Sequence, residues 1–278
     1  MKNILKIMLM MITIFTIAGS AVYAAEIPVS DQDQLITSND WTEISNLQDE
    51  MKKEEPDATI DYDKALKVYV DCNLIKLQTA DTKKLTSALE SANYVWVIPF
   101  KMEKTYGMFT VAKGLPLSEE AKSVLTKAEQ EEVKNHAGKW MITEIAEHTV
   151  EPYYDILLEK REALSDCTRV VLVGSQPGMR QPVALGMDDE TARIWISLGY
   201  QYPVMEKIPE TQNVESGVYS FDSVAEISDT YIEDSEVSTG AGVQSRSSIK
   251  YVAGIGIVLI GSILIISVLK KKKIKSED

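Results

Sequence analysis

The sequence contains few of the residues on which most enzyme chemistry depends. Among its 278 residues are two histidines, His136 and His148, and two cysteines, Cys72 and Cys167. A metalloprotease helix presents two histidines four residues apart, and this spacing is absent. Neither cysteine stands in the sequence context of a known nucleophile. We find no motif that names a reaction and expect no cofactor, so a non-enzymatic role is favoured.

Basic residues are also scarce relative to acidic ones. Residues 25–249 carry 21 Lys and Arg against 40 Asp and Glu, a net charge of −19. Such a surface repels nucleic acid and anionic lipid head groups, which argues against DNA or RNA binding. The simplest interpretation is that acidity keeps an exposed protein soluble. No calcium-loop motif accompanies it.

The N-terminus has the organisation of a secretory signal peptide. Lys2 and Lys6 precede an apolar stretch from Ile7 to Ile17, and Val22 and Ala24 occupy the small-residue positions of a cleavage site. We therefore assign residues 1–24 to a signal peptide. The alternative is an uncleaved N-terminal anchor, because the apolar stretch is nearly long enough to span a bilayer.

The C-terminus has the pattern of a single membrane anchor. Residues 250–269 include an uncharged stretch from Tyr251 to Leu269, which as a helix is about 28 Å long and crosses the hydrocarbon core. The Lys-rich tail 270–278 should remain cytoplasmic, which puts the preceding chain outside the cell membrane. This layout suits a Gram-positive bacterium. Attachment to the cell wall is an alternative, although Thr239-Gly240 retains only part of a sorting motif.

Composition divides the region outside the membrane into two parts. Residues 25–205 have the size of one domain with an adequate core. Residues 206–249 are first acidic and then rich in Ser and Gly, and such segments bury too little apolar surface to offset chain entropy. We therefore predict a disordered stalk over 206–249, although Val218, Phe221 and Val224 would allow part of it to dock on the domain.

Within residues 25–205 the apolar residues recur in some segments with the two-residue period of a strand and in others with the period of a helix. The segments with alternating or continuous apolar character, predicted as strands, are Ala65–Val70, Tyr94–Met102, Gly107–Ala112, Lys139–Glu144, Arg169–Val173, Gln181–Leu185 and Ala192–Leu198. The segments predicted as helices are Asn39–Lys53, Asp81–Ser91, Ser118–Lys134 and Val150–Leu164, with Asp81 and Ser118 as N-caps. Strict strand–helix alternation is missing, so we predict an α+β domain with a largely antiparallel sheet packed by helices.

The two cysteines suggest one long-range contact. Outside the cell Cys72 and Cys167 are expected to form a disulfide, and each flanks a predicted strand. We therefore expect the strand before Cys72 to lie near the strand after Cys167. The alternative is that both remain free, buried thiols.

Three further features are weak candidates for a site. On a helix, Glu144, His148 and Glu151 would share a face and could hold a metal ion. The segment Gly174–Gly178 resembles a nucleophile elbow only superficially and is better explained as a turn. Eight aromatic residues could line a groove, although at alternating strand positions most should belong to the core; they are Tyr94, Trp96, Phe100, Tyr106, Trp140, Tyr153, Tyr154 and Trp195.

These observations favour a membrane-anchored, cell-surface binding or interaction domain with an extracellular or membrane protein as partner. The short tail leaves no room for a folded domain inside the cell. The alternatives are a surface hydrolase, dependent on a metal or on carboxylates, that acts on cell wall or peptide, and an accessory subunit of a membrane complex.

Overall fold

The computed structural model describes residues 27–148, 151–174, 176, 178–179, 181–200, 202–209 and 213–235. The segments assigned above to the signal peptide, the membrane helix and the basic tail lie outside this part of the chain. Within it, no helix is both long and apolar enough to cross a membrane.

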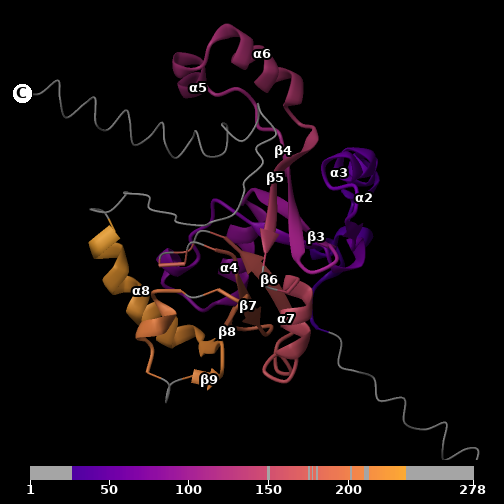
Figure 1. Ribbon diagram of the computed structural model, residues 1–278. Helices are drawn as coiled ribbons and strands as arrows, with labels where there is room; N and C mark the ends of the chain where they lie inside the picture. The colour runs from indigo at the N-terminus through magenta and orange to yellow at the C-terminus, as the bar shows by residue number, and fades with distance from the viewer. Residues whose placement is uncertain are drawn as a thin grey trace, which may run out of the picture.

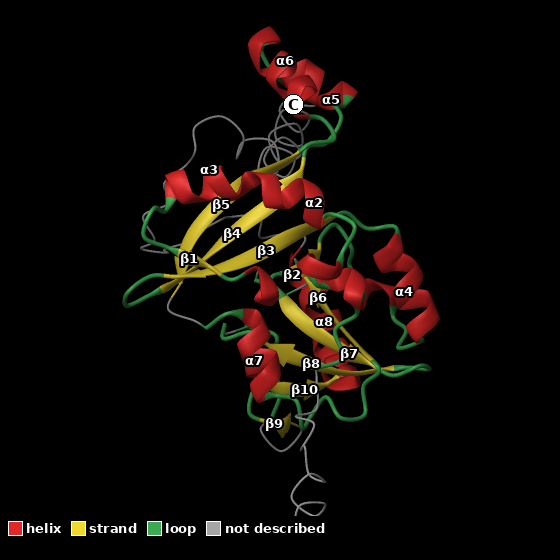
Figure 2. Ribbon diagram, turned by 90° about the vertical axis from the view of Figure 1, so that its right-hand side faces the viewer, coloured by secondary structure: helices red, strands yellow, loops and turns green. Residues whose placement is uncertain are grey.

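One sheet of ten strands organises the described domain (Figures 1 and 2). Its order is β5-β4-β3-β2-β6-β7-β8-β10-β9, and β1 pairs with β3. Every neighbouring pair is antiparallel except β2 and β6, which are parallel. The strands are β1 (Thr59–Ile60), β2 (Leu66–Tyr69), β3 (Tyr94–Lys101), β4 (Tyr106–Lys113), β5 (Trp140–His148), β6 (Arg169–Val173), β7 (Val183–Met187), β8 (Ala192–Ser197), β9 (Asn213–Glu215) and β10 (Val218–Ser220). The predicted α+β class and largely antiparallel sheet are confirmed.

Helices cover both faces of this sheet. The α-helices are α2 (Trp41–Ile44), α3 (Gln48–Glu54), α4 (Thr82–Glu90), α5 (Glu119–Val124), α6 (Lys127–His136), α7 (Tyr153–Glu159) and α8 (Phe221–Ser235). Short 3-10 helices occupy Asp31–Asp33, Leu35–Thr37, Ser45–Leu47, Tyr62–Lys64, Ile75–Leu77 and Met205–Lys207. Figure 2 shows α2 and α3 over β3 to β5, and Figure 1 shows α5 and α6 standing away from the sheet beyond β4 and β5.

Side-chain caps set where the helices begin. The Asp81 carboxylate accepts hydrogen bonds from the backbone N–H groups of Lys83 and Lys84, and the Ser118 hydroxyl accepts one from that of Ala121, as predicted. The single helix predicted over 118–134 is instead two. Thr126 forms a reciprocal capping box with Glu129 and begins the second helix, α6.

The strands are buried on both faces because their successive side chains point alternately into two separate cores. In β6, Val170 and Leu172 face the core under α7, whereas Val171 and Val173 face the core that includes Leu85 of α4. A third core lies beneath α2 and α3 and is filled by aromatic and aliphatic side chains of β3, β4 and β5. This two-sided burial explains the nearly continuous apolar runs in the central strands.

The stalk predicted from residue 206 onward does not match the structure over its first part. Residues 213–220 form the hairpin β9–β10, which pairs with β8 and extends the sheet. Helix α8 follows directly, and its Phe221 ring stacks on Trp195 at 5.8 Å. Val218 and Val224 are completely buried. Local acidity was outweighed by these few apolar side chains, whose burial stabilises the segment. Residues 236–249 lie outside the described chain.

The cysteines confirm the predicted neighbourhood of strands but not the predicted bond. The strand before Cys72, β2, pairs with the strand after Cys167, β6. Both thiols are nevertheless free and buried in the structure. Because the pairing is parallel, Cys72 follows the end of one strand while Cys167 precedes the start of the other, and the two belong to cores on opposite faces. A disulfide requires Cα atoms within about 7 Å.

Candidate functional site

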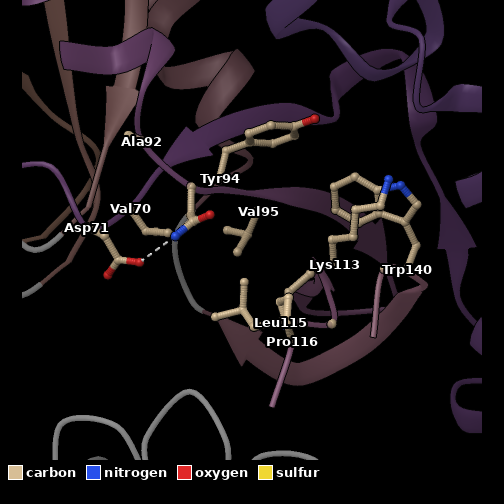
Figure 3. Close-up of a pocket in the computed structure, with 13 residues that line it drawn as sticks. Val70, Asp71, Ala92, Tyr94, Val95, Lys113, Leu115, Pro116 and Trp140 are labelled. Carbon is tan, nitrogen blue, oxygen red and sulfur yellow. Dashed lines mark hydrogen bonds between the residues drawn. The ribbon is translucent and has the colours of Figure 1, made fainter. Parts of the chain in front are cut away.

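A cavity of about 330 Å³ lies where β2 leaves the sheet and β3 enters it (Figure 3). Val95 and Ala112 are direct partners in the sheet and share one face, and with Val70 they give the cavity apolar walls. Leu115 and Pro116, on the connection to α5, close another side. The volume is at the lower end of the range for small-molecule sites, and the lining is largely apolar as in such sites.

A carboxylate stands at the rim of this cavity. Asp71 is exposed and has a φ of 58°, in the left-handed region that Asp tolerates better than most residues. Its Oδ2 accepts a hydrogen bond of 3.1 Å from Nδ2 of Asn93, while the backbone N–H of Val70 donates to the Asn93 carbonyl. Among the described residues, no cation lies within ion-pairing distance of Asp71. Its charge therefore remains available to a ligand.

A buried glutamine fixes the loop that follows Asp71. The Gln176 side chain is 3% exposed; its Nε2 donates to the carbonyls of Cys72 (2.6 Å) and Gly174 (3.0 Å), and its Oε1 accepts from the N–H of Leu74 (2.9 Å). Sequence analysis recognised a turn at Gly174–Gly178 but not this role. A glutamine inside a predicted turn gives no sign that it will be buried.

Five of the eight candidate aromatic residues belong to the core, and Tyr94, Tyr106 and Tyr154 are half-buried. Trp96, Phe100, Trp140, Tyr153 and Trp195 are all buried. Tyr94 and Trp140 border the cavity, but strand alternation places their rings on the face opposite Val95, where the ring centroids are 5.8 Å apart. Figure 3 likewise shows both rings across the β3 ribbon from Val95, so the cavity is lined mainly by aliphatic groups.

The helix on which Glu144, His148 and Glu151 were expected to share a face is not formed over Glu144 and His148. Glu144 and His148 both lie on strand β5, and α7 begins only at Tyr153, after Glu151. Four residues along a strand cover about 13 Å, whereas four along a helix cover about 6 Å. Within the described residues no group of three His, Cys, Asp or Glu side chains is arranged to hold a metal ion.

A cluster of buried charges lies on the other face of β2. The carboxylate of Asp33, which is 2% exposed, pairs with Lys67 Nζ at 3.7 Å and with an Arg169 Nη at 3.1 Å. It also accepts hydrogen bonds from the hydroxyls of Tyr69 (2.7 Å) and Ser30 (2.6 Å). The cluster joins the N-terminal segment to the central strands β2 and β6. The sequence signal was the single lysine between Leu66 and Val68, since an inward-facing charge requires a partner.

Aromatic rings surround the ammonium group in this cluster. Lys67 Nζ lies 4.5 Å from the ring centroid of Tyr94, 5.2 Å from that of Trp96 and 5.8 Å from that of Tyr69. Burial lowers the pKa of Lys67, and the nearby Asp33 carboxylate opposes this effect only in part. Asp40 accepts hydrogen bonds from the Tyr94 hydroxyl and the Trp96 indole N–H, which holds both rings in place.

No known protein is similar enough to this chain to assign a role to the cavity or to the charge cluster, so both are interpreted from their chemistry. The cavity offers an apolar surface beside one exposed carboxylate, and the cluster offers an amine beside a buried carboxylate. Searches of protein-family models, of curated proteins and of solved structures find no match to this chain.

Proposed function

We propose that this protein is a membrane-anchored cell-surface binding domain whose ligand enters the cavity beside Asp71. The cavity carries the proposal, because an apolar concavity with a fixed carboxylate at its rim has the general form of a ligand site. Lys113 also lines the cavity, but its Nζ lies over the Trp140 ring, 5.4 Å from the ring centroid. The cell-surface location rests on the sequence alone, through the signal peptide and the C-terminal anchor.

The chemistry of the site favours a ligand with an aliphatic or aromatic body and an ammonium group. The body would contact Val70, Val95 and Leu115, and the ammonium would pair with Asp71. The domain is strongly acidic, so its long-range field also attracts cations toward this rim. Partner proteins could supply the same chemistry through a lysine or an N-terminal amine.

Isothermal titration calorimetry with phenethylammonium as the probe tests the proposal on the full-length protein in detergent. We expect saturable binding to the wild type and none to Ala112→Phe, because the larger ring would fill the cavity. Thr110→Ser is a matched control on the same strand, two residues away. Equal binding to Ala112→Phe and to the wild type, with Ala112→Phe still folded, would overturn the assignment.

A further inference from the structure

The buried charge cluster contains two groups that can react with each other. The Lys67 and Asp33 side chains are only 10% and 2% exposed, and Nζ lies 3.7 Å from Oδ1, beyond hydrogen-bonding distance. Lys67 is otherwise surrounded by the three aromatic rings described above. An ion pair does not need to be enclosed by aromatic rings, and moving its two charges out of water costs desolvation free energy that an exposed pair does not lose.

We propose that Lys67 Nζ and Asp33 Cγ become joined by an intramolecular amide bond after the domain folds. A proton passes from the ammonium to Oδ1 of Asp33, and the resulting neutral amine attacks Cγ. The C–N bond forms, the nitrogen loses a second proton to Oδ1, and the Cγ–Oδ1 bond breaks with its electron pair. Ammonium and carboxylate thus become one amide and one water molecule, with no net change of charge and no external reagent.

Neighbouring groups are placed to assist both oxygens. Arg169 and the Ser30 hydroxyl donate to Oδ2, which becomes the amide oxygen and carries negative charge in the tetrahedral intermediate. The Tyr69 hydroxyl donates to Oδ1, the oxygen that leaves as water. Transfer of the first proton, from the ammonium to the carboxylate, is the step that the surroundings must promote.

The enclosure promotes that transfer. Burial penalises the ammonium more than the neutral amine and lowers the pKa of Lys67, whereas the ring faces attract the ammonium and hold it beside Asp33. Holding amine and carboxyl together in the fold gives a high effective concentration, which reaches about 10⁵ M or more in well-oriented systems. Exclusion of bulk water from the cluster then disfavours hydrolysis of the product.

Tryptic peptide mapping of the unfolded full-length protein tests the bond directly. Trypsin cuts after Lys64 and Lys76, but an amide at Lys67 blocks cleavage there. We expect a branched product in which peptide 65–76 is joined to the peptide that contains Asp33 and ends at Lys52, lighter than their sum by one water molecule. Tandem mass spectrometry should locate the branch at Asp33 and Lys67.

Two variants serve as controls. Lys67→Arg keeps the positive charge but lacks the amine nucleophile, so its two peptides should be separate, with trypsin cleaving after the substituted position. Lys64→Arg, at a partly exposed lysine that pairs with Asp155, should leave the branch unchanged. Separate linear peptides and full cleavage after Lys67 in the wild-type protein would overturn the proposal, and this result does not depend on any variant folding.

Discussion

Two polar regions flank the central strand β2, and they differ in how their charges are satisfied. On one face, Asp33 receives two cations and two hydroxyl groups and is shielded from water. Asp71, by contrast, is exposed at the rim of an apolar cavity. Its carboxylate accepts one hydrogen bond, from the side-chain amide of Asn93. The first arrangement joins parts of the fold, whereas the second leaves charge available for a ligand. Burial and pairing, more than residue type, therefore separate structural from recognition groups.

The largest effect should follow from breaking the buried region. Asp33→Ala leaves Lys67 and Arg169 buried without their partner and also prevents the proposed amide bond; removing one partner of a buried pair alone costs about 3–5 kcal/mol. Urea denaturation of both proteins measures this difference. Asp61→Ala, which removes the partly exposed partner of Lys64, should change stability by less than about 1 kcal/mol. If Asp33→Ala and Asp61→Ala lowered the free energy of unfolding by similar amounts, burial would not separate the two kinds of charged group.

A smaller loss of stability is expected when the loop after Asp71 loses the glutamine that holds it. Gln176→Ala deletes three hydrogen bonds, two to the loop after Asp71 and one to Gly174, and leaves the N–H of Leu74 without its acceptor. The expected cost is about 1–3 kcal/mol, and binding of phenethylammonium should weaken because Asp71 is held less firmly. Unchanged binding at reduced stability would show that the loop does not position the carboxylate.

Alkaline pH should lower the stability of the protein through its two buried thiols, Cys72 and Cys167. Burial raises the pKa of Cys72 and of Cys167 from about 9 to about 11. The unfolded chain then loses these protons first, so their contribution to stability is complete below pH 9 and is lost as pH rises to about 11. The double variant Cys72→Ala, Cys167→Ala should show a shallower alkaline decline in urea denaturation. An identical decline would contradict the raised values.

The smallest change in stability should come from the rim. Asp71→Asn retains a residue type that tolerates positive φ and should alter the free energy of unfolding by less than about 0.5 kcal/mol. Removing the charge should nevertheless weaken phenethylammonium binding, measurable by calorimetry. A marked loss of stability would place Asp71 among the structural groups.

The sequence predicted regular elements better than it predicted sites. The apolar run in Arg169–Val173 and the cap at Asp81 are local signals, and both elements formed as expected. Helical spacing was the wrong assumption for Glu144 and His148, because their segment pairs with β4 as a strand. The contact between Asp33 and Arg169 joins residues far apart in the chain, so no local pattern could reveal it. The stalk boundary failed because Val218 and Phe221 find burial only against the completed sheet.

Hydrogen–deuterium exchange of the full-length protein, with and without saturating phenethylammonium, locates the bound ligand. Binding in the cavity should slow exchange in segments 70–72, 92–95 and 112–115, which border it, and leave Asp33 and α7 unchanged. Protection confined to the buried cluster, or no protection anywhere, would contradict the assignment of the cavity as the binding site.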